Sequence, residues 1–168
     1  MSFAFHAIQL LYFMVPAYAA NMTPPFAKYL RHWNRPISRR CLGSHKTVLG
    51  FTVGVLAAVG STFVQSRIAW SGSMTSYDQW PVLGLLFGLG AMGGDSVKSF
   101  IKRRIGIPPG RPWIPFDQLD FVLGALTVVW HRVPLTRTDL VIVLLLSGIG
   151  DVMINHVSYF LGMRATKW

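Results

Sequence analysis

The stretch GLGAMGGDSVKSFIKRRIGIPPGRPWIPFDQLDFVL, from Gly88 to Leu123, decides how this chain is organised. It joins an apolar, glycine-rich segment to a second apolar segment, and its charges lie where the two segments end. Charged side chains are costly to place at the ends of membrane helices, so the pattern indicates a functional site. The charged residues are three carboxylates and five basic side chains: Asp95, Asp117, Asp120, Lys98, Lys102, Arg103, Arg104 and Arg111.

The composition is typical of a membrane protein. Of the 168 residues, 52% are hydrophobic, and they fall in long blocks. The formal net charge is +10; basic loops beside anionic lipid are its ordinary explanation, and polyphosphate binding is a sharper one. No helix-turn-helix, zinc or RNA-binding pattern accompanies the charge, so nucleic acid is not an expected partner. Cys41 is the single cysteine, which excludes an internal disulfide and a cysteine-based metal cluster.

Five apolar segments predict an all-α fold, a polytopic integral membrane bundle of five transmembrane helices in a single domain, residues 1–168. Gly50 and Gly54 should give the second segment a close-packing face, and the third helix is expected to continue through Arg104. The first segment could instead be a signal peptide, but no Lys or Arg precedes it. The segments run from about Phe3 to Ala20, Thr47 to Gln65, Trp80 to Gly94, Phe116 to His131 and Leu140 to Leu161.

The distribution of Lys and Arg predicts the orientation of this bundle. Residues 22–46 hold six of these side chains and residues 95–116 hold five, out of sixteen in the chain. Because Lys and Arg concentrate in cytoplasmic loops, both loops should face the cytoplasm, with the amino terminus outside and the carboxyl terminus inside. Within the first loop, apolar residues at helical spacing predict an interfacial helix from Phe26 to Ile37. The second loop, 95–116, would carry the catalytic residues on the cytoplasmic side of the cell membrane.

Three aspartates are the predicted metal ligands. Asp117 and Asp120 are three residues apart, so on a helix their carboxylates lie on one face and repel each other unless a cation lies between them. Oxygen ligands from Asp and phosphate are typical of Mg²⁺ sites, and Asp95 would add a third ligand. The structural alternative is that Asp117 caps the helix and Asp120 pairs with an arginine.

Basic residues near Asp95 are the predicted catalytic groups. Lys98 and Lys102 share a helix face with Asp95, and such lysines hold polyphosphate oxygens while a metal bridges them. Arg103 is the third candidate, whereas Arg104 is interpreted as a membrane anchor. The predicted nucleotide- or substrate-binding residues are Asn21, His45, Lys46, Thr47, Gly94 and Ser99.

These binding candidates rest on weaker signals. Lys46 lies at a helix start, where a phosphate can bind, but the surrounding residues lack the glycine spacing of a P-loop. Gly94 permits close approach of a ligand or, equally, of a neighbouring helix. Asp151 and Asn155 suit a polar contact inside the bundle, and Asp139 is expected to be solvated in an outer loop, as is Asp78.

Three blocks of the sequence resemble a known family. GDSVKSFIKRRIGIPPGRPWIPFDQLDFVLGAL, residues 94–126, is similar to the core of the archaeal CDP-archaeol synthases, the membrane CTP-transferases that activate ether lipids. PAYAAN (16–21) with Pro24-Pro25, and SHKTVLG (44–50), resemble the other two blocks of that family. The Ser-x-x-Lys-Arg and Asp-x-x-Asp elements are shared with the more distant CDP-diacylglycerol synthases, but their Lys-Asp pair and His-Gly-Gly element are missing. These departures favour the archaeal ether-lipid branch.

The resemblance implies a reaction. CTP and 2,3-bis-O-geranylgeranyl-glycerol 1-phosphate would give CDP-archaeol and pyrophosphate, with Mg²⁺ held by the three aspartates. Lys98, Lys102 and Arg103 would neutralise charge on pyrophosphate, while Lys46 and Asn21 would position the nucleotide or the lipid head. The partners would be CTP, the lipid phosphate and the bilayer, and no obligate protein partner is evident.

Three other functions are weighed against this one. A CTP-dependent polyprenol or lipid kinase would release CDP rather than pyrophosphate. A CDP-alcohol phosphotransferase would need a Asp-Gly-x-x-Ala-Arg block, which does not occur. A non-enzymatic membrane cation transporter would bury acids along its helices, whereas here they cluster beside basic residues. No Ser-His-Asp set, HExxH motif or dinucleotide fingerprint supports a protease or redox enzyme.

Overall fold

The computed structural model describes residues 2–29, 35–109 and 111–160, and over these residues the regular secondary structure is helical. Each predicted apolar segment corresponds to one α-helix, so the all-α prediction is confirmed; the predicted last residue, Leu161, lies outside the described residues. The helices are α1 (Phe3–Met22), α2 (Val48–Ile68), α3 (Trp80–Arg104), α4 (Phe116–Val129) and α5 (Arg137–Phe160), and a 3-10 helix, η1, covers Pro24–Tyr29.

The helix ends follow from local chemistry. Ser2 and Thr47 precede α1 and α2, and the Thr47 hydroxyl oxygen accepts the Gly50 N–H at 3.1 Å, a standard N-cap. Two successive prolines follow α1 and prevent its continuation. Helix α3 continues through Arg104, as predicted, and Gly106, at a φ of +79°, turns the chain just beyond it.

The loop between α1 and α2 differs from the prediction. Instead of an α-helix from Phe26 to Ile37, the described residues form η1 and an isolated antiparallel bridge between Pro36 and Thr47; residues 30–34 lie outside the described residues. The Ile37 N–H donates to the Lys46 carbonyl at 2.8 Å, and the Val48 N–H donates to the Arg35 carbonyl at 3.0 Å. A proline disfavours the helical conformation of the residue before it, so Pro36 accounts for the extended backbone there.

Within the part of the chain that the structure describes, three helices are long and apolar enough to cross a membrane: Phe3–Phe26, Val48–Ile68 and Arg137–Val157. Helix α3 has 25 residues, but its last turns carry charge, and α4 has only 14 residues. A bilayer core needs about 20 apolar residues in a helix, so α4 is short for a span.

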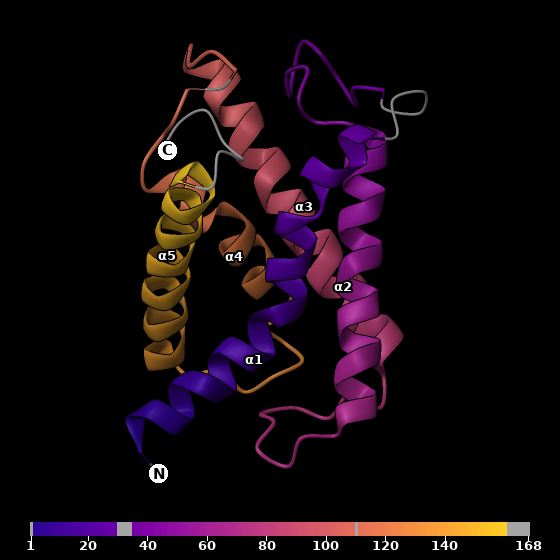
Figure 1. Ribbon diagram of the computed structural model, residues 1–168, viewed down its shortest axis with the longest axis vertical. Helices are drawn as coiled ribbons and strands as arrows, with labels where there is room; N and C mark the ends of the chain where they lie inside the picture. The colour runs from indigo at the N-terminus through magenta and orange to yellow at the C-terminus, as the bar shows by residue number, and fades with distance from the viewer. Residues whose placement is uncertain (1, 30–34, 110, 161–168) are drawn as a thin grey trace.

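Helix α3 lies at the centre of the bundle and packs against α1, α2 and α4 (Figure 1). Small residues permit this packing: a Cβ added at Gly94 would lie 2.2 Å from the Asp120 carbonyl oxygen, and one added at Gly124 would lie 2.2 Å from the Gly90 carbonyl oxygen. The close-packing prediction is confirmed for Gly54, where a Cβ would meet the Met92 sulfur at 2.5 Å. Glycines at these contacts let the helix backbones touch.

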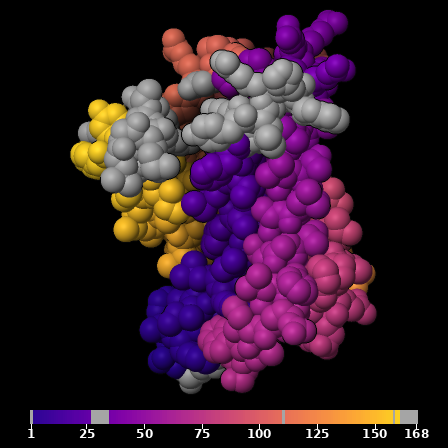
Figure 2. Space-filling model, turned by 45° about the vertical axis from the view of Figure 1, so that its right-hand side comes forward, coloured from indigo at the N-terminus to yellow at the C-terminus, as the bar shows by residue number. Residues whose placement is uncertain are grey.

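The two ends of the bundle gather different loops. Helices α1 and α2 lie side by side along the molecule (Figure 2). The α1–α2 and α3–α4 loops meet at one end, where a Cβ at Gly43 would lie 3.6 Å from the Pro109 ring (Figure 1). The start of α1 and the α2–α3 and α4–α5 loops meet at the other end, where Gln9 donates to the Gly72 carbonyl at 2.6 Å.

Candidate active site

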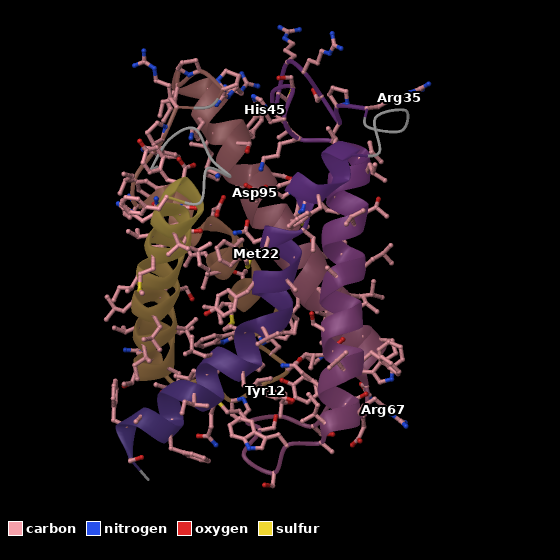
Figure 3. All side chains as sticks on the ribbon, in the orientation of Figure 1. Tyr12, Met22, Arg35, His45, Arg67 and Asp95 are labelled. Carbon is pink, nitrogen blue, oxygen red and sulfur yellow. The ribbon has the colours of Figure 1, made fainter. Side chains whose placement is uncertain are left out.

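The predicted site residues come together where α3 ends and α4 begins. Gly94 brings the α3 backbone against the Asp120 carbonyl, which sets the next residue, Asp95, beside the first turns of α4. Asp95 lies inside the same end of the molecule as the exposed His45 (Figure 3). The close contact between helices therefore positions the charged side chains.

Lys98 lies at the centre of the three predicted metal ligands. Its Nζ is 2.9 Å from Asp117 Oδ1, 2.8 Å from Asp120 Oδ2 and 3.3 Å from Asp95 Oδ1. The Lys98 side chain is 15% exposed, and that of Asp120 is 5% exposed. Three carboxylates from two helices thus converge on one cation in a largely buried position. We call these four residues the carboxylate–lysine cluster.

Lys46 connects the α1–α2 loop to this cluster. Its ammonium forms an ion pair with Asp95, and the Lys46 side chain is 25% exposed. The sequence predicts that Lys46 lies near a phosphate at the start of α2; the structure adds that it pairs with Asp95 of α3. Asp95 therefore contacts one lysine from the α1–α2 loop and one, Lys98, from its own helix.

Lys102 fixes the loop between α3 and α4. Its Nζ lies 2.9 Å from Asp117 Oδ2 and donates to the Arg111 carbonyl at 2.6 Å. Asp117 also accepts the Trp113 N–H at 2.5 Å. The structural alternative is wrong on both points: the α4 start has no side-chain cap, since Asp117 accepts the N–H of Trp113 before the helix, and Asp120 pairs with Lys98 and not with an arginine.

Two further candidates differ in how they are held. The Nε and Nη1 atoms of the half-buried Arg103 are shielded from solvent and have no hydrogen-bond partner among the described residues. Buried donors without partners are costly, and they are available to an incoming anion. Ser99, by contrast, donates to the Asp95 carbonyl at 2.8 Å within α3, and its role in binding stays a prediction.

The remaining binding candidates are not part of the cluster's ion pairs. Thr47 caps α2, His45 is exposed on the loop, and Asn21 lies in the last turn of α1. Gly94 packs against α4, which is the helix-packing alternative given for it above. Contacts of these four residues with a ligand stay predictions.

One polar residue was placed wrongly by the sequence. Asp139 is 5% exposed rather than solvated, and its carboxylate lies 2.6 Å from His6 Nε2 and accepts the Thr136 N–H at 2.8 Å. The partner comes from α1, 133 residues away, and no local pattern signals such a pair. Asp78 is exposed, as expected, and Asn155 donates to Asp151 at 2.9 Å.

The cluster can hold a divalent cation only after a rearrangement. The donor set fits Mg²⁺, because three carboxylates already converge on one positive charge, and hard cations prefer such oxygens. As they stand, however, the described residues contain no ready-made group of three or more His, Cys, Asp or Glu side chains around a metal position. An open cavity of about 260 Å³ lies at the opposite end, beside Asp78 and Arg132, away from the cluster.

Comparison with known proteins decides the family. A family model described as CarS-like, CDP-archaeol synthase, matches residues 4–168. The chain belongs to this family. Family members are CTP-dependent nucleotidyltransferases, so the resemblance stated from the sequence is confirmed.

Individual members of the CarS-like family are similar in sequence to this chain over most of their length. The CDP-archaeol synthase of Aeropyrum pernix is 36% identical over 96% of this chain and 92% of its own length. That of Methanopyrus kandleri is 34% identical over 94% of this chain and 91% of its own length. A solved structure described as an intramembrane enzyme for archaeal membrane lipids biosynthesis is 30% identical, with a TM-score of 0.67, and covers 86% of this chain. The chain is thus a membrane enzyme of this family.

Proposed function

We propose that this chain transfers CMP from CTP to 2,3-bis-O-geranylgeranyl-glycerol 1-phosphate in an Mg²⁺-dependent reaction that gives CDP-archaeol and pyrophosphate. The observation that carries this proposal is the carboxylate–lysine cluster, in which Asp95, Asp117 and Asp120 converge on one cation. The choice of CTP and of an archaeal lipid phosphate as substrates rests on the relatives, which are named CDP-archaeol synthases.

The chemistry needs no side-chain nucleophile. An oxygen of the lipid phosphate, already an anion, attacks the α-phosphorus of CTP, and pyrophosphate leaves. Catalysis of such a transfer is chiefly positioning and stabilisation of charge on the phosphate oxygens. Mg²⁺, held by the three aspartates, would supply charge neutralisation for the triphosphate.

The basic residues around the cluster have distinct roles in this mechanism. Lys98 and the half-buried Arg103 neutralise charge that develops on the pyrophosphate. Lys46, on the opposing loop, contacts the nucleotide or the lipid head group from the other side of Asp95. Lys102 keeps Asp117 and the Arg111 carbonyl in place.

We further propose that all five α-helices cross the membrane, with the amino terminus outside, the carboxyl terminus inside and the active site facing the cytoplasm. The two loops richest in Lys and Arg meet at one end of the bundle, in agreement with this orientation. The chain end beyond residue 160, with Arg164 and Lys167, lies outside the described residues. The lipid tails would lie between helices, in contact with the bilayer.

The alternative functions predict a different arrangement of charge or a different product. A cation transporter needs acids along its helices, whereas Asp95, Asp117 and Asp120 gather at one end beside lysines. A CTP-dependent lipid kinase could use a similar cluster, so only the product distinguishes it.

The test uses detergent-purified protein, Mg²⁺ and CTP labelled at the α-phosphate, with the geranylgeranyl ether phosphate as acceptor. Label should enter the lipid fraction with one pyrophosphate released per lipid. Retention of the label in CDP, with γ-phosphate transferred to the unphosphorylated lipid alcohol, would establish the kinase instead. No turnover with either acceptor would contradict both enzymes.

A further inference from the structure

We propose that Lys98 is a tethered cation that occupies the metal position in the nucleotide-free enzyme, and that it moves to a nucleotide phosphate when metal and CTP bind together. This inference rests on the proposed function, which supplies the metal and the nucleotide. It makes Lys98 responsible for the order of binding as well as for charge neutralisation.

The geometry of the cluster is that of an ammonium site. The three N–O distances, 2.8, 2.9 and 3.3 Å, suit ion pairs with a lysine, whereas Mg²⁺ binds oxygen at about 2.1 Å. A metal at the centre would draw the carboxylates inward and would repel the ammonium beside it. Lys98 and a divalent cation therefore cannot share the position.

Lys98 is also the lysine that, among the described residues, forms ion pairs with all three carboxylates. Lys46 pairs with Asp95 from outside the cluster, and Lys102 is tied to the Arg111 carbonyl as well as to Asp117. Those two can stay in place when a metal enters. Lys98 follows Asp95 by three residues on α3, so a change of side-chain rotamer is enough to turn its ammonium from the carboxylates to a nearby phosphate.

The burial of Asp120 explains why the Lys98 ammonium occupies the metal position before a metal binds. Asp120 is almost fully buried, and its described partners are Lys98 and the Phe121 N–H, which donates at 2.7 Å. A buried carboxylate without a positive partner is strongly destabilising, so a cation beside Asp120 stabilises the apoenzyme. The triphosphate of CTP offers Lys98 a new anionic partner, so the exchange of ammonium for metal leaves no charge unpaired. Metal binding should therefore depend on nucleotide.

The test is a Mn²⁺ titration of the detergent-purified full chain, followed by electron paramagnetic resonance, with and without CTP and without lipid. The wild-type chain should bind Mn²⁺ weakly alone and more tightly with CTP. Lys98→Met should tighten Mn²⁺ binding without CTP by roughly tenfold or more, because three carboxylates then lack their competing cation. Lys98→Arg keeps the positive charge and should bind as weakly as wild type. Arg67→Gln, which removes an exposed charge at the far end of α2, is the matched control.

Unchanged or weaker Mn²⁺ binding by Lys98→Met would overturn the inference, and so would equal tightening by Lys98→Arg. The melting temperature of each variant is measured first; if Lys98→Met does not fold, Lys98→Gln takes its place. If neither folds, the wild-type chain decides, since equal Mn²⁺ affinity with and without CTP overturns the inference. Label transfer by the wild-type chain is measured separately, so failure of the proposed function is recognised independently of the titration.

Discussion

Both ends of this helix bundle bury polar side chains, but they do so in different ways. At one end, Gln9 donates to the Gly72 carbonyl and Gln65 to the Tyr12 carbonyl, both at 2.6 Å, and Asp139 is held by His6 and the Thr136 N–H. At the other end, three carboxylates and three lysines lie within ion-pair distance of one another. Tyr12 and Arg67 mark the first end in Figure 3, and His45 and Asp95 the second.

The comparison separates structural from functional polarity. Backbone carbonyls and N–H groups pair with Gln9, Gln65 and Asp139 at the first end and tie α1 to its neighbours, while the Tyr12 and Tyr77 hydroxyls stay buried without a hydrogen-bond partner among the described residues. The second end concentrates ionisable side chains, three carboxylates paired with three lysines, and such clusters of charge in a partly buried position are typical of functional sites. The predictions below test this division.

The largest effect is expected for Asp120→Asn. Replacing the carboxylate with an amide keeps the shape of the side chain but removes a proposed metal ligand and an ion-pair partner of Lys98. Cytidylyl transfer should therefore fall roughly 100- to 1,000-fold. The measurement is incorporation of α-labelled phosphate into lipid at saturating CTP. Activity within a few-fold of wild type would remove Asp120 from the catalytic set.

The second prediction compares alanine substitutions at two neighbouring glycines, Gly94 and Gly93. A Cβ at Gly94 would meet the Asp120 carbonyl at 2.2 Å, whereas a Cβ at Gly93 would meet nothing within 4 Å. Gly94→Ala should push α3 from α4, cost about 1–3 kcal/mol of stability and distort the cluster. Gly93→Ala should leave the melting temperature and transfer unchanged. Equal behaviour of the two variants would mean that the α3–α4 contact does not position the site.

Lys102→Met should have an intermediate effect. Without its bonds to Asp117 and the Arg111 carbonyl, the 105–115 loop should open more often, and hydrogen exchange by its amides should accelerate. Transfer should fall about tenfold, a smaller loss than for Asp120→Asn, because Lys102 positions Asp117. Loss of activity without faster exchange in this loop would indicate direct contact with substrate instead.

The smallest effect on activity is expected for Asp139→Asn, a buried aspartate at the structural end. Weakening its contact with His6 should cost about 1–3 kcal/mol of stability, seen as a lower melting temperature in detergent. Transfer by the folded variant should stay within about twofold of wild type, since the mutation is at the end away from the cluster. A large loss of activity at unchanged stability would contradict the assignment of a purely structural role to the end of the bundle that holds Asp139.

The sequence predicts the helices well because each long apolar run corresponds to one α-helix. It also predicts that Asp95, Asp117 and Asp120 act together, since two are three residues apart and the third follows the apolar part of the preceding helix. It does not predict that Lys98 lies among the three aspartates. Helix periodicity shows which residues share one face of a helix, but not which residues of another helix pack against that face. The same limit hides the pairing of His6 with Asp139, which depends on how α1 lies against the α4–α5 loop.

In the loop after α1, apolar residues spaced at about 3.6 residues per turn predict one interfacial helix. Prolines at 24, 25 and 36 restrict the backbone at both ends of that stretch, and the described residues form η1 and a bridge to Thr47. Backbone restriction outweighs periodicity here. Lys46 reaches Asp95 through this arrangement.

The most direct test of the account is a crystal structure of the full chain with Mn²⁺ and CTP, in which anomalous scattering locates the metal. The account predicts an anomalous peak about 2.2 Å from oxygens of Asp95, Asp117 and Asp120, with Lys98 turned to a phosphate. A metal and nucleotide bound elsewhere, with Lys98 still among the three carboxylates, would contradict it.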